Sequence, residues 1–162
     1  MKGMRYILLL FAVIFLTAGC QDLYYMPFKV TGQGMGTAAF YLDGSPYRTS
    51  SVHKATGNGS ASSCAVNFTC HSETHGIGNY NVAISIQTDE NNPIQKECEY
   101  RVSGEQDIPY VSIVINGFSA EDGYVKFRKY EGMISGNFEF TCVDDEGVRH
   151  SVKYGTFDVP NW

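Results

Sequence analysis

Apolar residues recur at every second position from Ala38 to the end of this chain, and this alternation constrains the fold most strongly. Val82, Ile84 and Ile86, for example, are separated only by small or polar residues. The same period recurs at Phe40 and Leu42, Val66 and Phe68, Tyr100 and Val102, Val111 to Ile115, Val125 and Phe127, Phe138 and Phe140, and from Val152 through Tyr154 and Phe157 to Val159. Because successive side chains of a strand point to opposite faces, this pattern predicts strands with one buried face.

Turn-forming residues separate these runs. The breaks are Asp43–Pro46, Asn91–Pro93, Glu121–Gly123 and Asp144–Gly147. No window of a dozen residues beyond the N-terminal segment has a helical period. The sequence therefore predicts one all-β domain over residues 38–162, an antiparallel β-sandwich or partly closed barrel of about eight to nine strands.

The N-terminus has the composition of an export signal. Lys2 and Arg5 precede an uncharged apolar run over residues 6–16, which small residues and Cys20 follow. This order predicts a signal peptide over residues 1–19. A helix over the apolar run would span roughly 16 Å, about half of a ~30 Å hydrocarbon core, so a permanent membrane span is disfavoured.

A cysteine directly after Ala18 and Gly19 resembles a bacterial lipoprotein signal, in which the cysteine is lipidated and becomes the new N-terminus. We expect acyl chains on Cys20 to anchor the protein in a membrane. The outer membrane is favoured because Asp22 lies one place too late for the usual inner-membrane retention signal; the face of that membrane stays open. The glycine-rich residues 20–37 are expected to form a tether. An ordinary secretory signal is the alternative.

Charge argues against nucleic acid as a partner. The chain has 12 basic and 17 acidic residues, a net charge of −5. Removal of residues 1–19 takes away two basic residues and no acidic one, so the mature chain carries −7. Binding to a phosphate backbone requires a concentrated basic surface, which this balance disfavours.

The four remaining cysteines, Cys64, Cys70, Cys98 and Cys142, have the same strand parity as the apolar residues around them. In an exported protein they are candidates for disulfides in the core. If residues 64–70 form one strand, Cys64 and Cys70 lie roughly 20 Å apart, beyond the ~7 Å that a bridge allows. Two pairings stay open: Cys64–Cys98 with Cys70–Cys142, or Cys64–Cys142 with Cys70–Cys98. Free thiols, or a metal site at Cys70, His71 and His75, are the alternatives.

Catalytic motifs are not apparent. None of the four histidines lies in a known nucleophile or zinc motif. We therefore expect a protein that is not an enzyme and uses no metal or cofactor. A small hydrolase or metal-dependent enzyme using His71, His75 or His150 is the first alternative. A structural subunit or inhibitor of a secreted enzyme is the second.

Tyrosines on the expected outer faces of the strands are candidates for ligand contact, since a tyrosine combines a flat apolar ring with a polar tip. These are Tyr41, Tyr47, Tyr110 and Tyr130. They favour a binding or interaction module whose ligand is a glycan or another envelope protein. Tyrosine is also common in strands for packing reasons alone.

The C-terminal quarter contains I-S-G-N-F-E-F over residues 134–140 and Y-G-T-F-D-V over residues 154–159. This pattern resembles the ending of small Bacteroidota cell-envelope lipoproteins with an uncharacterised β-sandwich domain. The run from Ala39 to Tyr47 is similar to their first strand and turn. The resemblance implies an envelope lipoprotein without an established activity, and it supplies no catalytic residues.

Overall fold

The computed structural model describes residues 33–49, 55–72, 78–104, 107–130 and 132–161. Within these ranges every regular element is a β-strand, which confirms the all-β prediction. The strands are β1 (Thr37–Leu42), β2 (Ser45–Arg48), β3 (Ala55–Gly59), β4 (Ser63–Ser72), β5 (Asn79–Gln87), β6 (Glu99–Arg101), β7 (Tyr110–Ile115), β8 (Phe118–Lys129), β9 (Met133–Val143) and β10 (Arg149–Pro160). The described ranges contain no helix long and apolar enough to cross a membrane.

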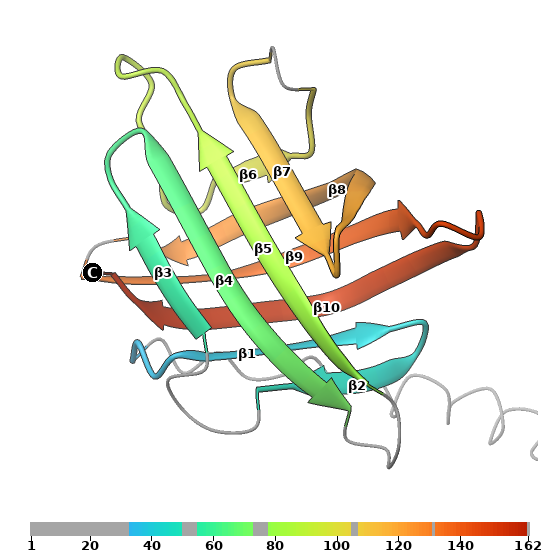
Figure 1. The fold of residues 1–162 in the computed structure, drawn as a ribbon. Coiled ribbons are helices and arrows are strands. Elements are labelled where there is room, and N and C mark those ends of the chain that lie inside the picture. Colours follow the sequence, from blue (N-terminus) through green and yellow to red (C-terminus); the bar gives the residue numbers. More distant parts are fainter. Residues whose placement is uncertain (1–32, 50–54, 73–77, 105–106, 131, 162) are drawn as a thin grey trace, which may run out of the picture.

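The strands form one antiparallel sheet in the order β2-β1-β10-β9-β8-β7-β5-β4-β3, and β6 pairs with β8. In Figure 1 the layer β3-β4-β5-β7 crosses in front of the layer that contains β8, β9, β10 and β1. Two short pairings, β7 with β8 and β2 with β4, connect the layers at their corners. The sheet therefore curls into a sandwich-like ring without forming a clear barrel, within the architecture that the sequence predicts.

The core between the layers is built from the inward residues of the alternation. Phe40, Phe127, Phe138 and Phe157 are among its fully buried side chains. The ring of Phe138 lies at the centre, 5.5 Å from the centroid of Phe68 and 6.2 Å from that of Phe157. Burying each such ring stabilises the fold by about 2–3 kcal/mol.

The described ranges contain ten strands, more than the expected eight or nine, because the alternation does not reveal the short ones. The turn expected over Asp43–Pro46 comprises only Asp43 and Gly44, which both have positive φ angles (49° and 84°). Such a two-residue turn matches the twist of a hairpin, so Ser45 and Pro46 already belong to β2. The other short strands, β3 and β6, have five and three residues.

The break expected at Glu121–Gly123 is wrong, because β8 continues through it. A β-bulge between Ala120 and Asp122 absorbs the irregularity. The backbone of Gly123 has a φ of 154°, and a Cβ built there would lie 2.4 Å from the carbonyl oxygen of Glu139. Gly123 therefore allows β8 and β9 to approach closely, where the sequence suggested a turn.

The segment before β1 lies against the domain. The Asp158 carboxylate is buried, with 1% exposure. It accepts the backbone N–H groups of Gln33 (3.0 Å) and Gly34 (2.9 Å). The last residues of the predicted tether therefore belong to the folded part. The predicted signal peptide, the predicted lipid attachment at Cys20 and the rest of the tether lie outside the described residues.

Candidate functional site

The four cysteines of the domain are free thiols, so neither expected disulfide pairing is present. Cys64, Cys70 and Cys142 point into the core as predicted, whereas Cys98 is half-buried just before β6. Two of the sulfurs form a hydrogen bond with a group other than cysteine. The Cys70 thiol donates to the Ala38 carbonyl at 3.5 Å and the Cys98 thiol to the Gln95 side chain at 3.6 Å. The four free thiols correct the expectation of two stapling disulfides among these residues.

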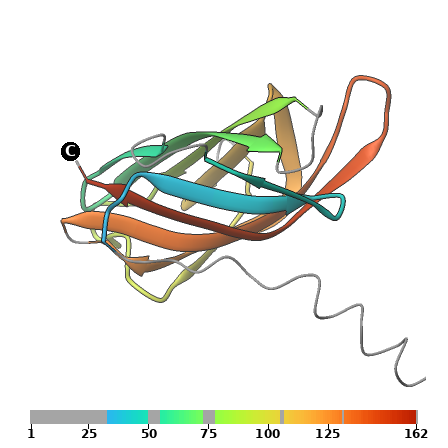
Figure 2. The same cartoon turned by 90° about the horizontal axis from the view of Figure 1, so that it is seen from below.

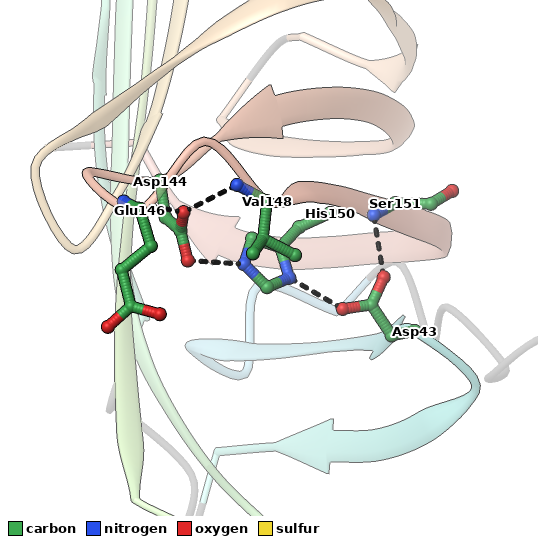
Figure 3. A network of polar contacts seen from close by, with 6 residues as sticks. All are labelled: Asp43, Asp144, Glu146, Val148, His150 and Ser151. Atoms are coloured by element: carbon green, nitrogen blue, oxygen red, sulfur yellow. Dashed lines mark hydrogen bonds and ion pairs between the residues drawn. The ribbon is translucent and has the colours of Figure 1, made fainter.

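His150 on β10 contacts carboxylates in two hairpin turns, as Figure 3 shows. Its Nδ1 lies 2.6 Å from the Asp43 carboxylate in the β1–β2 turn. Its Nε2 lies 3.2 Å from Asp144 at the start of the β9–β10 turn. Asp43 also accepts the backbone N–H of Ser151 at 2.8 Å. We call Asp43, His150 and Asp144 the hairpin clamp.

The charges of the hairpin clamp favour an imidazolium. Hydrogen bonds to Asp43 and Asp144 raise the pKa of His150 above its ordinary value. The backbone N–H of Val148, together with His150, lowers the pKa of Asp144. An imidazolium donates from both ring nitrogens and has no lone pair left for a substrate proton or a metal. In this arrangement His150 connects two hairpins, and a base for hydrolysis would first have to leave its partners.

The other histidines of the enzyme alternative are not part of this cluster. His71 on β4 contacts the Asn79 side chain on β5. His75 and His53 lie outside the described residues. Within the described ranges, no group of three His, Cys, Asp or Glu side chains is arranged to hold a metal ion. The structure thus does not bring His71 into contact with His150 or its carboxylates.

The four candidate tyrosines have different positions. Tyr47 is 2% exposed and stacks on Phe40 at 5.5 Å between ring centroids, so it cannot contact a ligand. The Tyr130 hydroxyl donates to the carbonyls of Ser60 and Ser63, each at 2.8 Å. That tyrosine is committed to the β3–β4 turn. Only Tyr41 on β1 and Tyr110 on β7 present their rings on outer faces, where a ligand can reach them.

Among the described residues, the outer side of the layer β3-β4-β5-β7 bears no acidic or basic side chain over its central part. We call it the uncharged face; its described residues are Thr56, Asn58, Ala65, Asn67, Thr69, Asn81, Ala83, Ser85, Tyr110, Ser112 and Val114. Thr56, Asn67, Ala83 and Val114 form one row across the four strands. In contrast, the outer side of the other layer carries charges such as Glu139 and Lys153.

A shallow cavity of about 750 Å³ lies on the uncharged face, extending from Thr56 on β3 to the β7–β8 turn. Part of its polar lining is already paired. The Asn116 side chain accepts the Asn81 N–H at 2.8 Å, and the Thr69 hydroxyl donates to the Asn81 side chain at 2.6 Å. The side chains of Thr56 and Asn67 form no hydrogen bond with the described residues. They therefore present donors and acceptors to solvent inside the cavity.

The uncharged face was not predicted from the sequence, because the prediction used only the apolar residues of each alternation. The polar residues would have indicated it, since the outward residues of β5 are uncharged whereas those around β6 are Glu97, Glu99 and Arg101. Comparisons with known proteins do not identify the site, because no family model, curated protein or solved structure matches this chain.

Proposed function

We propose that the protein is a non-enzymatic binding module of the bacterial cell envelope, anchored by lipid on Cys20, whose uncharged face binds a neutral glycan. The observation that carries the ligand assignment is the lack of charged side chains among the described residues of the cavity-bearing face, in a chain with 17 acidic and 12 basic residues. The N-terminal pattern and the resemblance to small Bacteroidota lipoproteins support the location. The outer membrane remains the proposed site of the anchor.

A neutral glycan suits this face for physical reasons. Sugar hydroxyls both donate and accept, and so do the side chains of Thr56 and Asn67. Binding a neutral ligand there desolvates no charged group, which would cost far more than an amide or hydroxyl. Tyr110, at the start of β7 on the same face, offers a ring for stacking on the apolar side of a sugar.

Affinity electrophoresis through gels that contain a soluble polysaccharide tests this proposal. The probes are dextran, yeast mannan and arabinogalactan, with polygalacturonate as an anionic comparison. We expect at least one neutral polysaccharide to retard the protein. The variant Asn67→Asp places a carboxylate in the cavity and should weaken that binding about tenfold, which corresponds to about 1.4 kcal/mol.

Asn137→Asp is the matched control, because Asn137 lies on the outer side of β9 in the other layer. It introduces the same charge and should leave the retardation unchanged. Equal effects of the two variants, or no retardation by any neutral polysaccharide, would contradict the proposed ligand class. Mass spectrometry of the exported protein tests the anchor separately, since lipidation requires an acylated Cys20 as the N-terminal residue.

A further inference from the structure

A β-bulge in β10 presents two consecutive side chains on the outside of the molecule. The pairing with β9 passes from Val152–Phe140 to Gly155–Phe138, so β10 contains one extra residue there. The pairing of β10 with β1 shows the same shift, between Ala39 and Tyr41. As a result, Lys153 and Tyr154 both point outward, although strict alternation would bury one of them.

Tyr154 adopts a backbone conformation that bulky residues rarely occupy. Its φ is 53°, and its side chain is 38% exposed. This exposure corrects the expectation from alternation that Tyr154 belongs to the core. The left-handed region costs a residue with a Cβ about 1–2 kcal/mol, and such a cost often accompanies a functional position.

The inward position after the bulge requires glycine. A Cβ built on Gly155 would lie 2.6 Å from ring atoms of Phe138, which occupies that part of the core. The core packing therefore fixes Gly155 inside and forces Tyr154 outside. The backbone is therefore strained at Tyr154, although its exposed aromatic ring contributes little to the core.

Tyr154 and Tyr41 form an aromatic pair over a cavity. Their ring centroids are 6.1 Å apart and the ring planes are at 87°, so one ring edge meets the other ring's face. The cavity has a volume of about 350 Å³ and is lined by Tyr41, Asp43, Gly44, Ser151, Lys153 and Tyr154. We call it the Tyr41–Tyr154 pocket.

Polar groups converge on the same pocket. The Asp43 carboxylate is held by His150 at 2.6 Å and by the Ser151 N–H at 2.8 Å, as Figure 3 shows. A carboxylate offers about four acceptor sites, so further donors can still bind it. Lys153 lines the pocket and forms no ion pair with any residue that the structure describes. The pocket thus combines aromatic rings with a fixed acceptor and an available donor.

We infer that the Tyr41–Tyr154 pocket binds a single neutral pyranose ring. The apolar side of the sugar packs on the tyrosine rings, while its hydroxyls donate to Asp43 and accept from Lys153. This site goes beyond the proposed function, because it belongs to the layer opposite the uncharged face and uses none of its residues. Only the ligand class is shared, and each site can be removed without the other.

NMR titration of the ¹⁵N-labelled protein with methyl α-glucopyranoside, methyl α-mannopyranoside and methyl β-galactopyranoside tests the inference. We expect one of these glycosides to shift the amide signals of residues 41–44 and 151–154, with a Kd of about 1 mM, typical of a small and weakly bound ligand. Tyr154→Gly removes the ring and at the same time relieves the positive φ. It should keep or raise the melting temperature and weaken binding about tenfold.

Two further variants test whether the binding depends on the ring of residue 154 and whether it involves the uncharged face. Tyr154→Phe keeps the ring and should retain the affinity within about threefold. Tyr110→Ala removes a ring from the uncharged face and should leave the titration unchanged. The inference is overturned if none of the glycosides shifts these signals, or if Tyr154→Gly binds as tightly as the natural chain. Polysaccharide retardation by the uncharged face can succeed or fail independently of both results.

Discussion

At the scale of single residues, the imidazole of His150 between two carboxylates makes stability depend on pH. Its pKa in the folded protein is raised, so its contribution is complete below the ordinary pKa of about 6.5 and is lost as the pH rises through the folded value. The pKa of Asp144 is lowered, so its contribution is present above about 3.8 and is lost as the pH falls through the folded value. The hairpin clamp therefore stabilises most in the weakly acidic range.

The variant His150→Gln removes the positive charge of the imidazolium from the hairpin clamp. We expect its melting temperature to lie below that of the natural chain at about pH 5, and the difference to shrink as the pH rises through the raised pKa of the natural imidazole. Thermal unfolding followed by circular dichroism measures both values. His71→Gln is the control, because His71 contacts an amide side chain and no carboxylate in the described structure. A pH-independent difference would contradict the ionic role of His150.

The cysteines lead to a second prediction at this scale. Burial raises the pKa of the Cys64 and Cys70 thiols to about 12, so almost no thiolate is present at neutral pH. With iodoacetamide under native conditions we expect Cys98 to react first, since it alone of the four is half-buried. Cys64, Cys70 and Cys142 should react only after unfolding. Peptide mapping by mass spectrometry shows which cysteines have been alkylated. Cysteines that stay unreactive toward iodoacetamide after unfolding without a reductant would instead indicate disulfides.

At the scale of elements, the bulge in β8 depends on a glycine that the sequence presents as part of a turn. In the variant Gly123→Ala the new methyl group would lie 2.4 Å from the Glu139 carbonyl oxygen and 2.5 Å from the Phe140 Cβ. Neither atom is the end of a flexible side chain, so β8 and β9 must separate. We expect a loss of about 3 kcal/mol in the free energy of unfolding, measured with urea.

Gly147→Ala is the control for this loss. Gly147 also has a positive φ, 80°, but nothing lies within 4 Å of a Cβ built there. Gly147→Ala should therefore lower the free energy of unfolding by only about 1 kcal/mol, the cost of a Cβ in this backbone conformation. Equal losses in the two variants would show that the conformation of Gly123 matters and its contact with β9 does not.

The same elements show how far the sequence predicts the fold. Alternation correctly predicts the buried residues of long strands such as β4, β5 and β9, because a regular strand repeats every two residues. It fails at Tyr154 and at Gly123, because a bulge shifts the repeat by one residue. Asp-Gly pairs occur both in the turn at Asp43 and inside β8, and local sequence does not distinguish the two.

At the scale of the whole molecule, the hairpin clamp and the uncharged face both depend on contacts between distant segments. The hairpin clamp joins residues 107 positions apart, and the uncharged face combines residues from β3 to β7. Strand order decides which polar halves share a layer, and a single sequence does not contain that order. Tyr41 and Tyr110 were therefore predictable as outward residues, whereas Tyr154 and the absence of charge around Asn67 became visible only in the folded chain.

The positions of the two candidate sites lead to a prediction about the intact molecule. The uncharged face belongs to the layer β3-β4-β5-β7, whereas the Tyr41–Tyr154 pocket is lined by residues of β1 and β10 in the other layer. Figures 1 and 2 show the two layers from two directions. A single sugar ring cannot occupy both, so the sites should bind independently. Saturation with the methyl glycoside that fills the pocket should leave retardation by the neutral polysaccharide unchanged, whereas Tyr154→Gly should weaken glycoside binding alone.

Independence of this kind has a measurable consequence for glycan chains. One copy of the protein can hold a polysaccharide on one layer and the end of a second glycan on the other. Light scattering of a branched polysaccharide whose chain ends carry the sugar that fills the pocket should therefore grow when the natural protein is added. It should grow clearly less with Tyr154→Gly or with Asn67→Asp, because each variant weakens one of the two contacts about tenfold. Growth with both single variants would place the cross-linking contacts elsewhere on the surface.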